Sequence, residues 1–396
     1  MKFLKKLILL NYHFDTNQLG HVYTYNILLA NEATKQGIDT EIWAPLSLSG
    51  FENDKIVKKV LEVSLFEFKN QTIIQKLLII PRLFKDIIKN FRDKRLDENT
   101  IILIEDLNFQ ILFSIFLASF FLKPKFRLVI ILRQFDSPFI KNSTFKFLIK
   151  NIVYLILIKL VITNKWITVG SDSELITAAL AKFGIKNTSV LPIPHIPQQS
   201  KPCVEKTISY LGAARVDKGF DLLPEIIEQC ITELNENVPE LRFLIQSIGT
   251  DDDPIISKTK ETLKHLSEKF KGKIILIDKS LDRDSYIKLL SKSWILLNLY
   301  KDKIYKNGTS GIFAEGIGLG KWIIVPENTW MAMQTSKYDK IKVIKDLNSK
   351  SVLQAIKECL ASEPRLDKER IKNQIKNWRS FHSSENYINI LKNMIK

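Results

Sequence analysis

The stretch that decides the fold is YKNGTSGIFAEGIGLGKWIIVP, residues 305–326. Its pattern predicts a loop, a helix that carries Glu315, a glycine stop, and WIIVP as a short buried strand. Small residues let a ligand approach the backbone, and the first N–H groups of a helix attract an anion. We therefore expect a phosphate-bearing ligand here, with the Glu315 carboxylate available to ribose hydroxyls. An ordinary helix with a glycine C-cap would show the same pattern.

A second stretch, TISYLGAARVDKGFDLLPEII at residues 207–227, has a similar pattern. A strand breaks at Gly212, a basic loop with Arg215 and Lys218 follows, and a helix comes next. Strand, glycine, cation and helix also suit phosphate binding. Two such sites, several βα units apart, can meet at one crevice beyond the strand ends of an open parallel sheet.

Strand-like and helix-like segments alternate along the whole chain, which predicts an α/β protein with parallel sheets. Helices are expected between the strands, for example over 222–234, 256–270 and 284–292. The expected strands are 6–11, 39–45, 100–106, 127–133, 166–171 and 188–194, and then 208–212, 241–249, 273–278, 294–300, 322–326 and 340–344. A proline-rich connector, LPIPHIPQQSKP, separates the two groups and indicates two domains.

The two glycine-containing stretches resemble the carboxy-terminal half of glycosyltransferase family 4, the retaining enzymes of GT-B fold. LGAARVDKG is similar to the strand-Gly-Arg-Lys-Gly segment of that family, and SGIFAEGIGLGKWIIV to its helix with Glu and a Gly-Lys end. The first half of the chain resembles the family more loosely. The resemblance implies two Rossmann-like domains facing across a cleft, an acceptor domain at 1–198 and a nucleotide-sugar domain at 203–375. It also implies a last helix, 376–396, that crosses back to the first domain.

The resemblance assigns roles to particular residues. Lys218 and Arg215 would stabilise the leaving diphosphate, although the Arg-to-Lys spacing is shorter here than in the family. The family has two glutamates separated by seven residues; the second matches Glu315, and the first falls on Asn307. Expected donor-binding residues are Gly212, Asn307, Thr309, Ser310, Gly311 and Glu315. The sugar and acceptor loop would contain Gly20, His21 and Arg133, the last at a place where the family often has histidine.

The composition points to acidic partners. The chain has 396 residues, with 59 Lys and Arg against 43 Asp and Glu, and so a net charge of +16. Nucleoside diphosphates, anionic lipids and nucleic acids all fit this charge, although a compositional bias would produce it too. The three cysteines show no disulfide framework or metal spacing, which favours a reducing compartment. Asp251–Asp253 reads as a solvated loop, and we expect no metal and no other cofactor.

Three segments are unusually apolar or basic-amphipathic: 73–95, 107–122 and 145–166. None has the ~20 uninterrupted apolar residues that a membrane span needs. Two alternatives remain for these segments. They are basic amphipathic helices that dock on an anionic bilayer, or they are core helices with solvated lysines. We accordingly expect a cytoplasmic location, with peripheral association at the inner face of the cytoplasmic membrane as an open question.

The sequence thus predicts transfer of a sugar from a nucleotide-diphosphate-sugar to a hydroxyl of a glycan or lipid-linked glycan, with retention, in cell-surface polysaccharide or glycolipid synthesis. Retention is implied by the resemblance alone, because no nucleophile stands out. A non-catalytic nucleotide-sugar-binding protein of the same fold is the first alternative, supported by Asn307 and the short Arg-to-Lys spacing. A basic nucleic-acid binder is the second; it lacks a recognisable binding motif, so we expect no nucleic-acid partner.

Overall fold

The computed structural model describes residues 3–14, 21–51, 54–65, 73–93, 95–133, 145–194, 206–249, 253–301 and 305–395. The chain divides into two compact units. Unit 1 consists of Met1–Ile196 with His382–Lys396, and unit 2 is Pro197–Phe381. The segment that returns to unit 1 therefore starts at residue 382, a few residues after the expected 376.

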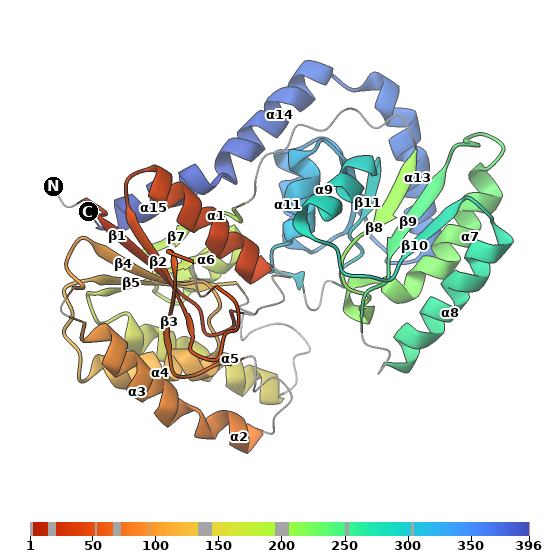
Figure 1. Cartoon of the computed structure of the whole chain (residues 1–396). Helices are drawn as coiled ribbons and strands as arrows, with labels where there is room; N and C mark the ends of the chain where they lie inside the picture. Colours follow the sequence, from red (N-terminus) through yellow and green to blue (C-terminus); the bar gives the residue numbers. More distant parts are fainter. Residues whose placement is uncertain are drawn as a thin grey trace. The chain divides into compact units, whose positions relative to one another are not determined.

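Unit 1 is built on a parallel sheet (Figure 1). Its described strands are β1 (Lys6–Leu10), β2 (Asp39–Pro45), β3 (Val57–Leu61), β4 (Thr100–Ile104), β5 (Arg127–Leu132), β6 (Ile167–Ser171) and β7 (Thr188–Val190). Their order is β3-β2-β1-β4-β5-β6-β7, and every pair is parallel. The central strands are buried on both faces, which explains why they read as continuous hydrophobic runs. The order reverses between β1 and β4, so the topological switch point of this sheet lies there.

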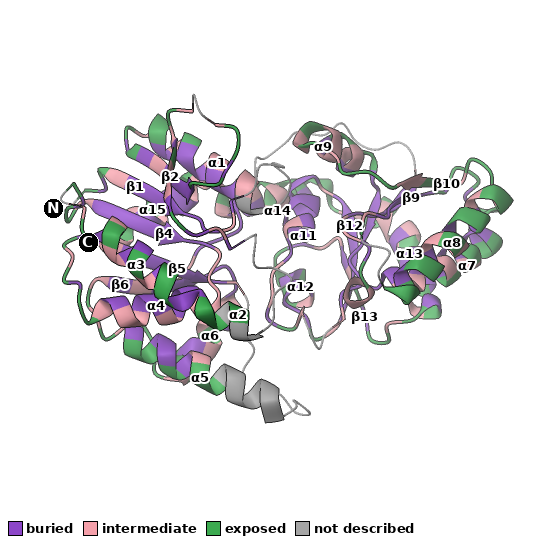
Figure 2. Cartoon of the chain, turned by 60° about the horizontal axis from the view of Figure 1, so that its bottom comes forward, coloured by how far each residue is buried: buried purple, intermediate pink, exposed green. Residues whose placement is uncertain are grey.

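Helices cover both faces of this sheet. The described helices of unit 1 are α1 (His21–Lys35), α2 (Ile73–Leu78), α3 (Ile80–Phe91), α4 (Phe109–Ser119), α5 (Phe145–Val161), α6 (Glu174–Lys182) and α15 (Ser384–Ile395). Side chains of α3, α4, α5 and α6 share one apolar core with the sheet, and those of α1 and α15 share the other. Along α1 and α3, buried positions alternate with exposed ones, as the purple and green stretches of Figure 2 show.

Unit 2, like unit 1, is built on a parallel sheet. Its described strands are β8 (Thr207–Tyr210), β9 (Arg242–Gln246), β10 (Ile274–Ile277), β11 (Ile295–Leu297), β12 (Trp322–Pro326) and β13 (Ile341–Ile344). All pairs are parallel in the order β10-β9-β8-β11-β12-β13. The chain runs outward from β8 to β10 and then crosses to β11, so the switch point lies between β8 and β11.

The helices of unit 2 include α7 (Leu223–Leu234), α8 (Pro254–Lys269), α9 (Arg283–Lys292), α11 (Gly311–Gly318), α12 (Trp330–Met333), α13 (Ser349–Ser362) and α14 (Lys368–Phe381). α7, α8 and α13 share an apolar core with one face of the sheet. α11 lies directly against the other face, because a Cβ at Gly316 would sit 2.4 Å from Leu296 Cδ1 and 3.1 Å from Ile323 Cδ1. The glycine in FAEGIGLG is therefore a packing requirement that brings α11 close to β11 and β12.

The structure confirms the expected fold class, two α/β domains with parallel sheets. Every expected strand is present, most of them shorter by a residue or more at one or both ends. One strand was missed: β3, VKKVL, forms an edge of the unit 1 sheet. Its two lysines interrupt the apolar pattern that identifies a strand in the sequence. Charged side chains are typical of edge strands, because they prevent pairing with a strand of another molecule. Within the described ranges, no helix is long and apolar enough to cross a membrane.

Candidate functional site

The two predicted phosphate-binding stretches lie at the switch point of the unit 2 sheet. The first follows the carboxyl end of β8, and the second follows the carboxyl end of β11, which is the neighbouring strand. Ligands of open α/β sheets bind at such a position, outside the carboxyl ends of the strands. The two stretches are almost a hundred residues apart in the sequence, and the crossover from β10 to β11 brings them close together.

Gly212 brings the two stretches together. Its φ is +106°, a conformation that L side chains rarely adopt, and its N–H donates to Gln246 Oε1 at 2.7 Å. A Cβ at this position would lie 2.9 Å from Ile312 Cδ1, in the first turn of α11, and 4.0 Å from Lys218 Nζ. The backbone after β8, the Lys218 ammonium and the start of α11 therefore form one small neighbourhood.

The two predicted cations have different surroundings. Lys218 ends the short 3-10 turn Val216–Lys218 and is half-buried, with Nζ 5.2 Å from the centre of the Tyr300 ring. No carboxylate pairs with Lys218 within the described ranges. Arg215 is exposed, and its guanidinium makes a two-point contact with the Asp217 carboxylate. Lys218 is thus the cation available to an anion, whereas the charge of Arg215 is already compensated.

Ser310 and Tyr300 order the start of α11. Ser310 is the N-cap residue, and its buried hydroxyl accepts the N–H of Phe313 at 3.3 Å. The same hydroxyl donates to Tyr300 Oη at 3.4 Å. The Tyr300 ring also lies against the Tyr305 ring, with ring centres 4.6 Å apart and the ring planes tilted by 48°. Because the Tyr300 ring contacts both Lys218 and Ser310, it connects the two stretches; sequence analysis had placed it only at the end of a strand.

The remaining loop residues also lie at this edge. Asn307 is buried, and Thr309 is partly buried in the loop before α11. Gly311 is the first residue of α11, so its N–H is one of the donors that a helix start leaves unpaired. The structure places these residues where the sequence predicted them; their roles in ligand binding stay predictions.

Glu315 is buried on α11, so it is not a solvated helix glutamate. Its Oε2 accepts the Tyr286 hydroxyl at 2.9 Å, and its Oε1 lies 2.6 Å from Arg283 Nη2. Both partners come from α9, and burial together with the Glu315 charge raises the pKa of Tyr286 well above its ordinary value. Sequence analysis missed this Arg283–Glu315–Tyr286 cluster. Each carboxylate oxygen retains a second lone pair, so Glu315 can still accept a hydroxyl from a ligand.

A second polar cluster lies at the carboxyl edge of the unit 1 sheet. Arg133, directly after β5, donates to the Glu105 carbonyl and carboxylate, both at 3.0 Å, and to Asp172 Oδ2 at 3.4 Å. The Tyr387 hydroxyl of α15 donates to Glu105 Oε1 at 3.1 Å. Burial raises the pKa of Glu105, and the adjacent Arg133 opposes this shift.

This cluster changes the expectation for Arg133. Its guanidinium is held by two carboxylates and lies 5.0 Å from the Tyr25 ring centre. Arg133 therefore joins three strand ends to the helix that returns from unit 2, and its charge is largely compensated. The other predicted members of this loop, Gly20 and the side chain of His21, lie outside the described residues.

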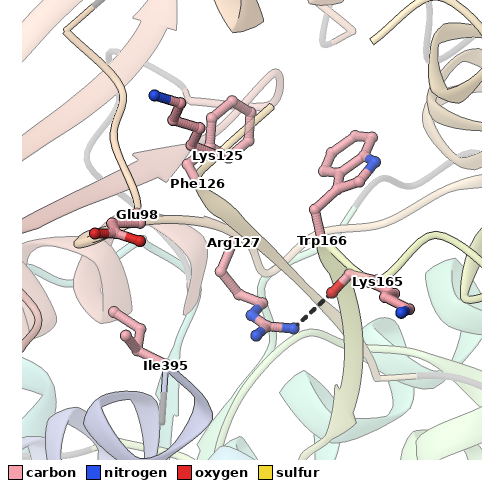
Figure 3. A pocket seen from close by; sticks show the side chains of 7 residues that line it. All are labelled: Glu98, Lys125, Phe126, Arg127, Lys165, Trp166 and Ile395. Carbon is pink, nitrogen blue, oxygen red and sulfur yellow. Dashed lines mark hydrogen bonds between the residues drawn. The ribbon is translucent and has the colours of Figure 1, made fainter. Parts of the chain in front are cut away.

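The opposite, amino-terminal edge of the same sheet carries a pocket. Lys125, Arg127, Lys165 and Glu98 line it together with three apolar side chains (Figure 3). Arg127 turns inward to donate to the Lys165 carbonyl at 2.8 Å. Ligand sites of such sheets lie at the carboxyl edge, so we assign no function to this pocket.

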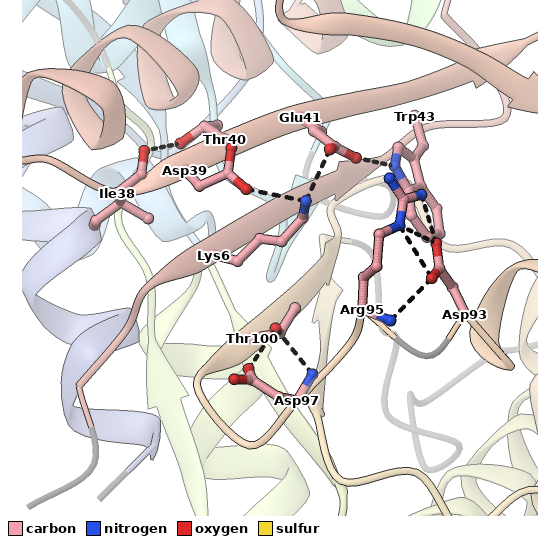
Figure 4. A network of polar contacts seen from close by, with 10 residues as sticks. All are labelled: Lys6, Ile38, Asp39, Thr40, Glu41, Trp43, Asp93, Arg95, Asp97 and Thr100. Carbon is pink, nitrogen blue, oxygen red and sulfur yellow. Dashed lines mark hydrogen bonds and ion pairs between the residues drawn. The ribbon is translucent and has the colours of Figure 1, made fainter.

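Further along that amino-terminal edge, a polar network ties strand starts together (Figure 4). Lys6 of β1 donates to Asp39 at 3.0 Å and to Glu41 at 2.8 Å, both on β2. Trp43 Nε1 donates to the other oxygen of Glu41 at 2.8 Å. The network fixes the register of β1 against β2 and is structural.

No protein-family model and no curated protein matches this sequence. Among solved structures, the chain is similar to sucrose-phosphate synthase from Thermosynechococcus elongatus, with a TM-score of 0.72 and 11% identity over 98% of each chain. A UDP-forming trehalose-phosphate synthase from Burkholderia xenovorans, in complex with glucose-6-phosphate, gives a TM-score of 0.69 at 11% identity, covering 99% of this chain and 100% of its own. A glycosyltransferase from Rickettsia africae gives 0.64 at 14% identity, covering 99% and 98%. Such likeness shows the fold, which is GT-B.

Within the described ranges, no group of three or more His, Cys, Asp or Glu side chains is arranged so that it could hold a metal ion. Asp251 and Asp252 lie outside those ranges, while Asp253 caps α8 by accepting the Ile255 N–H at 2.9 Å. The expectation that no metal is needed stays a prediction.

Proposed function

We propose that this chain is a glycosyltransferase. It moves a sugar from a nucleotide-diphosphate-sugar to a hydroxyl of a glycan or lipid-linked glycan, in cell-surface polysaccharide or glycolipid synthesis. The observation that carries the proposal is the neighbourhood of Gly212, Lys218 and the start of α11 at the switch point of unit 2. The GT-B neighbours support it, since one of them is a UDP-forming synthase.

In this mechanism the difficult step is departure of the nucleoside diphosphate. Negative charge grows on the β-phosphate as the bond to the anomeric carbon breaks. Lys218 and the free N–H groups at the start of α11 would stabilise that charge without rearranging. Ser310 keeps this helix start in place through Phe313. Glu315 would take the ribose hydroxyls, and Arg215 would act only if Asp217 released it. We propose that no metal takes part and that the anomeric configuration is retained.

The first experiment is a thermal-shift screen against UDP-, GDP- and ADP-sugars, followed by release of the nucleoside diphosphate on addition of acceptor. A ligand at 100 times its Kd stabilises the folded protein by about 2.7 kcal/mol. We expect one nucleotide class to raise Tm and an acceptor to accelerate release. Binding with no release for any glycan or lipid-linked acceptor would favour the non-catalytic alternative.

A surface of unit 1 supports a lipid-linked acceptor. On α5, Ile152, Ile156 and Leu160 are exposed at a spacing of four residues and therefore share one face. Further exposed apolar residues lie on α2 and just after α4: Leu77, Leu78, Phe120 and Phe121. We call these seven exposed residues, on α2, just after α4 and on α5, the apolar face; α4 and α5 contribute to the core on one side of the sheet.

Cations accompany the apolar face. Lys159 of α5 and Lys85 of α3 are exposed, whereas Lys89 pairs with Glu62 at 2.6 Å and so contributes less net charge than expected. Lys146 and Lys150, which the sequence also suggested, have side chains outside the described residues. α5 buries its other side in the core, as the core-helix alternative predicted, and docking of its exposed side on a bilayer stays a prediction. We propose that the apolar face docks on the anionic inner leaflet from the cytoplasm.

This docking has a matched test. Ile156 of α5 is 51% exposed and Ile255 of α8 is 53% exposed, so glutamate at either position is tolerated similarly by the fold. We expect Ile156→Glu to reduce sedimentation with vesicles that contain anionic lipid, and Ile255→Glu to leave it unchanged. Binding should also weaken as salt rises. A wild-type protein that stays in the supernatant at low salt would remove the docking proposal and shift the acceptor toward a soluble glycan.

A further inference from the structure

One carboxylate joins the two loops of the unit 2 site. Asp217 lies in the turn Val216–Lys218, and both of its oxygens bind the Arg215 guanidinium, Nε to Oδ1 at 2.9 Å and Nη2 to Oδ2 at 2.5 Å. This two-point geometry is the strongest arrangement of such an ion pair. The Tyr305 hydroxyl, from the loop before α11, donates to Asp217 Oδ2 at 3.2 Å. Burial raises the pKa of Tyr305, so this hydroxyl stays protonated and remains a donor.

The backbone keeps this turn in place independently of the arginine side chain. The Lys301 N–H donates to the Asp217 carbonyl at 2.9 Å, so the main chain of the turn is attached to the segment that follows β11. A Cβ at Gly219, whose φ is +75°, would lie 2.6 Å from the Leu299 carbonyl oxygen, which shows how closely the two segments pack. By contrast, 52% of the Arg215 side chain is exposed. Loss of the Asp217 charge would therefore free the guanidinium without releasing the turn.

Arg215 lies close to the proposed diphosphate site. Its backbone carbonyl accepts the Lys218 N–H at 3.1 Å, so the two cations belong to one turn. Burial opposes the charge of the guanidinium, but Asp217 and two nearby tyrosines, Tyr305 and Tyr300, raise its pKa above the ordinary value. The Tyr300 ring also contacts the Lys218 ammonium. Both cations are thus near the same tyrosine, and within the described ranges a carboxylate pairs with Arg215 and not with Lys218.

We propose that Asp217 keeps Arg215 away from the nucleoside diphosphate and so weakens the binding of this product, which can then leave after transfer. The inference rests on the proposed function and concerns the same site. Lys218 and the start of α11 stabilise the leaving group, whereas a second uncompensated cation in the same turn would bind donor and product more tightly alike. Tight product binding slows turnover where release limits the rate. Asp217 is thus a positioning residue that acts through Arg215.

The binding test uses Asp217→Asn, because asparagine keeps the shape of the side chain and an oxygen that can accept the Tyr305 hydroxyl. Calorimetric titration with UDP, GDP and ADP gives the Kd of the diphosphate that the wild-type chain binds. We expect the variant to bind it at least about tenfold more tightly, because hydrogen bonds to charged groups are the strong ones. This gain should shrink as salt rises.

The direction of the change separates this role from a merely structural one, since damage to the fold weakens binding. In the transfer reaction, Asp217→Asn should also lower KM for the donor and make the diphosphate a stronger product inhibitor. Equal or weaker diphosphate binding by a folded Asp217→Asn variant would overturn the proposal. A wild-type chain that binds none of the three diphosphates would instead reject the donor site itself, so the two failures are distinguishable.

The Arg215→Met background is the matched control. Asparagine at position 217 also removes the direct repulsion between this carboxylate and a diphosphate, and that effect would persist without the arginine. We expect Asp217→Asn to change Kd by less than about threefold in the Arg215→Met background, because the two substitutions act through one contact. A full gain in that background would overturn the proposal. If Asp217→Asn does not fold, Arg215→Met alone decides, since a large loss of affinity would show that Arg215 already binds the diphosphate.

Discussion

Replacing Lys218 by methionine tests the leaving-group role with little disturbance of the fold. Methionine keeps an unbranched apolar chain beside the Tyr300 ring and removes only the ammonium, which lies 5.2 Å from the ring centre. The lysine has no carboxylate partner within the described ranges, so no buried charge is left uncompensated. The cation–π contact contributes about 0.5–1 kcal/mol, and we expect the free energy of unfolding to fall by no more than this.

The effect on catalysis should be larger. A preorganised group aimed at developing charge contributes about 2.7–4 kcal/mol to the transition state, which corresponds to a loss of 10²–10³ in kcat. Arg215→Met is the matched control, because Asp217 already compensates the arginine. Since Arg215 is exposed, we expect it to change kcat by less than about tenfold.

The assay is release of nucleoside diphosphate under saturating donor, with thermal unfolding measured on the same samples. Lys218→Met should fold normally and lose activity, and Arg215→Met should remain active. Equal losses in both variants would place the diphosphate between the two cations. Activity of Lys218→Met within a few-fold of wild type would refute the leaving-group assignment.

Three further predictions concern single side chains. Glu315→Ala should weaken binding of both nucleotide-sugar and free nucleoside diphosphate and cost about 1–3 kcal/mol of stability, because Arg283 loses its partner; an effect on acceptor affinity alone would contradict this role. Gly212→Ala should cost about 1–3 kcal/mol from the positive φ and the contact with Ile312, visible as a lower Tm and weaker nucleotide binding; an unchanged Tm would disprove the strain. Burial raises the pKa of Asp86 from 3.8 to about 6, so its contribution is fully present below about pH 3.8 and is lost, by up to about 3 kcal/mol, as the pH rises through 6. Asp86→Asn should flatten the free energy of unfolding over this window in denaturant titrations, and an unchanged slope would contradict the shift.

The sheets were predictable from sequence because buried parallel strands appear as continuous runs of Ile, Leu and Val. The position of Gly212 was predictable for the same reason, since it comes just after such a run, whereas Ser310 was predictable as the polar residue that ends a loop before a helical pattern. β3 was not, because an edge strand contacts the core on only part of its surface and tolerates lysines.

The partners of the site residues were harder to predict. Whether Glu315 is free or held depends on Arg283 and Tyr286, about thirty residues away on another helix. The pairing of Arg133 with Glu105 and Asp172 likewise arises from strand order, which periodicity does not specify. Asp217, by contrast, is only two residues from Arg215, so that compensation was visible in the sequence.

The most direct test of the glycosyltransferase assignment is nucleoside diphosphate release from UDP-, GDP- and ADP-sugars in the presence of a membrane glycolipid fraction. The wild-type chain should release diphosphate from one nucleotide class, faster with the glycolipid than without it, and Lys218→Met should lose this release while remaining folded. A folded wild-type protein that neither binds nor turns over any of these donors would contradict the account.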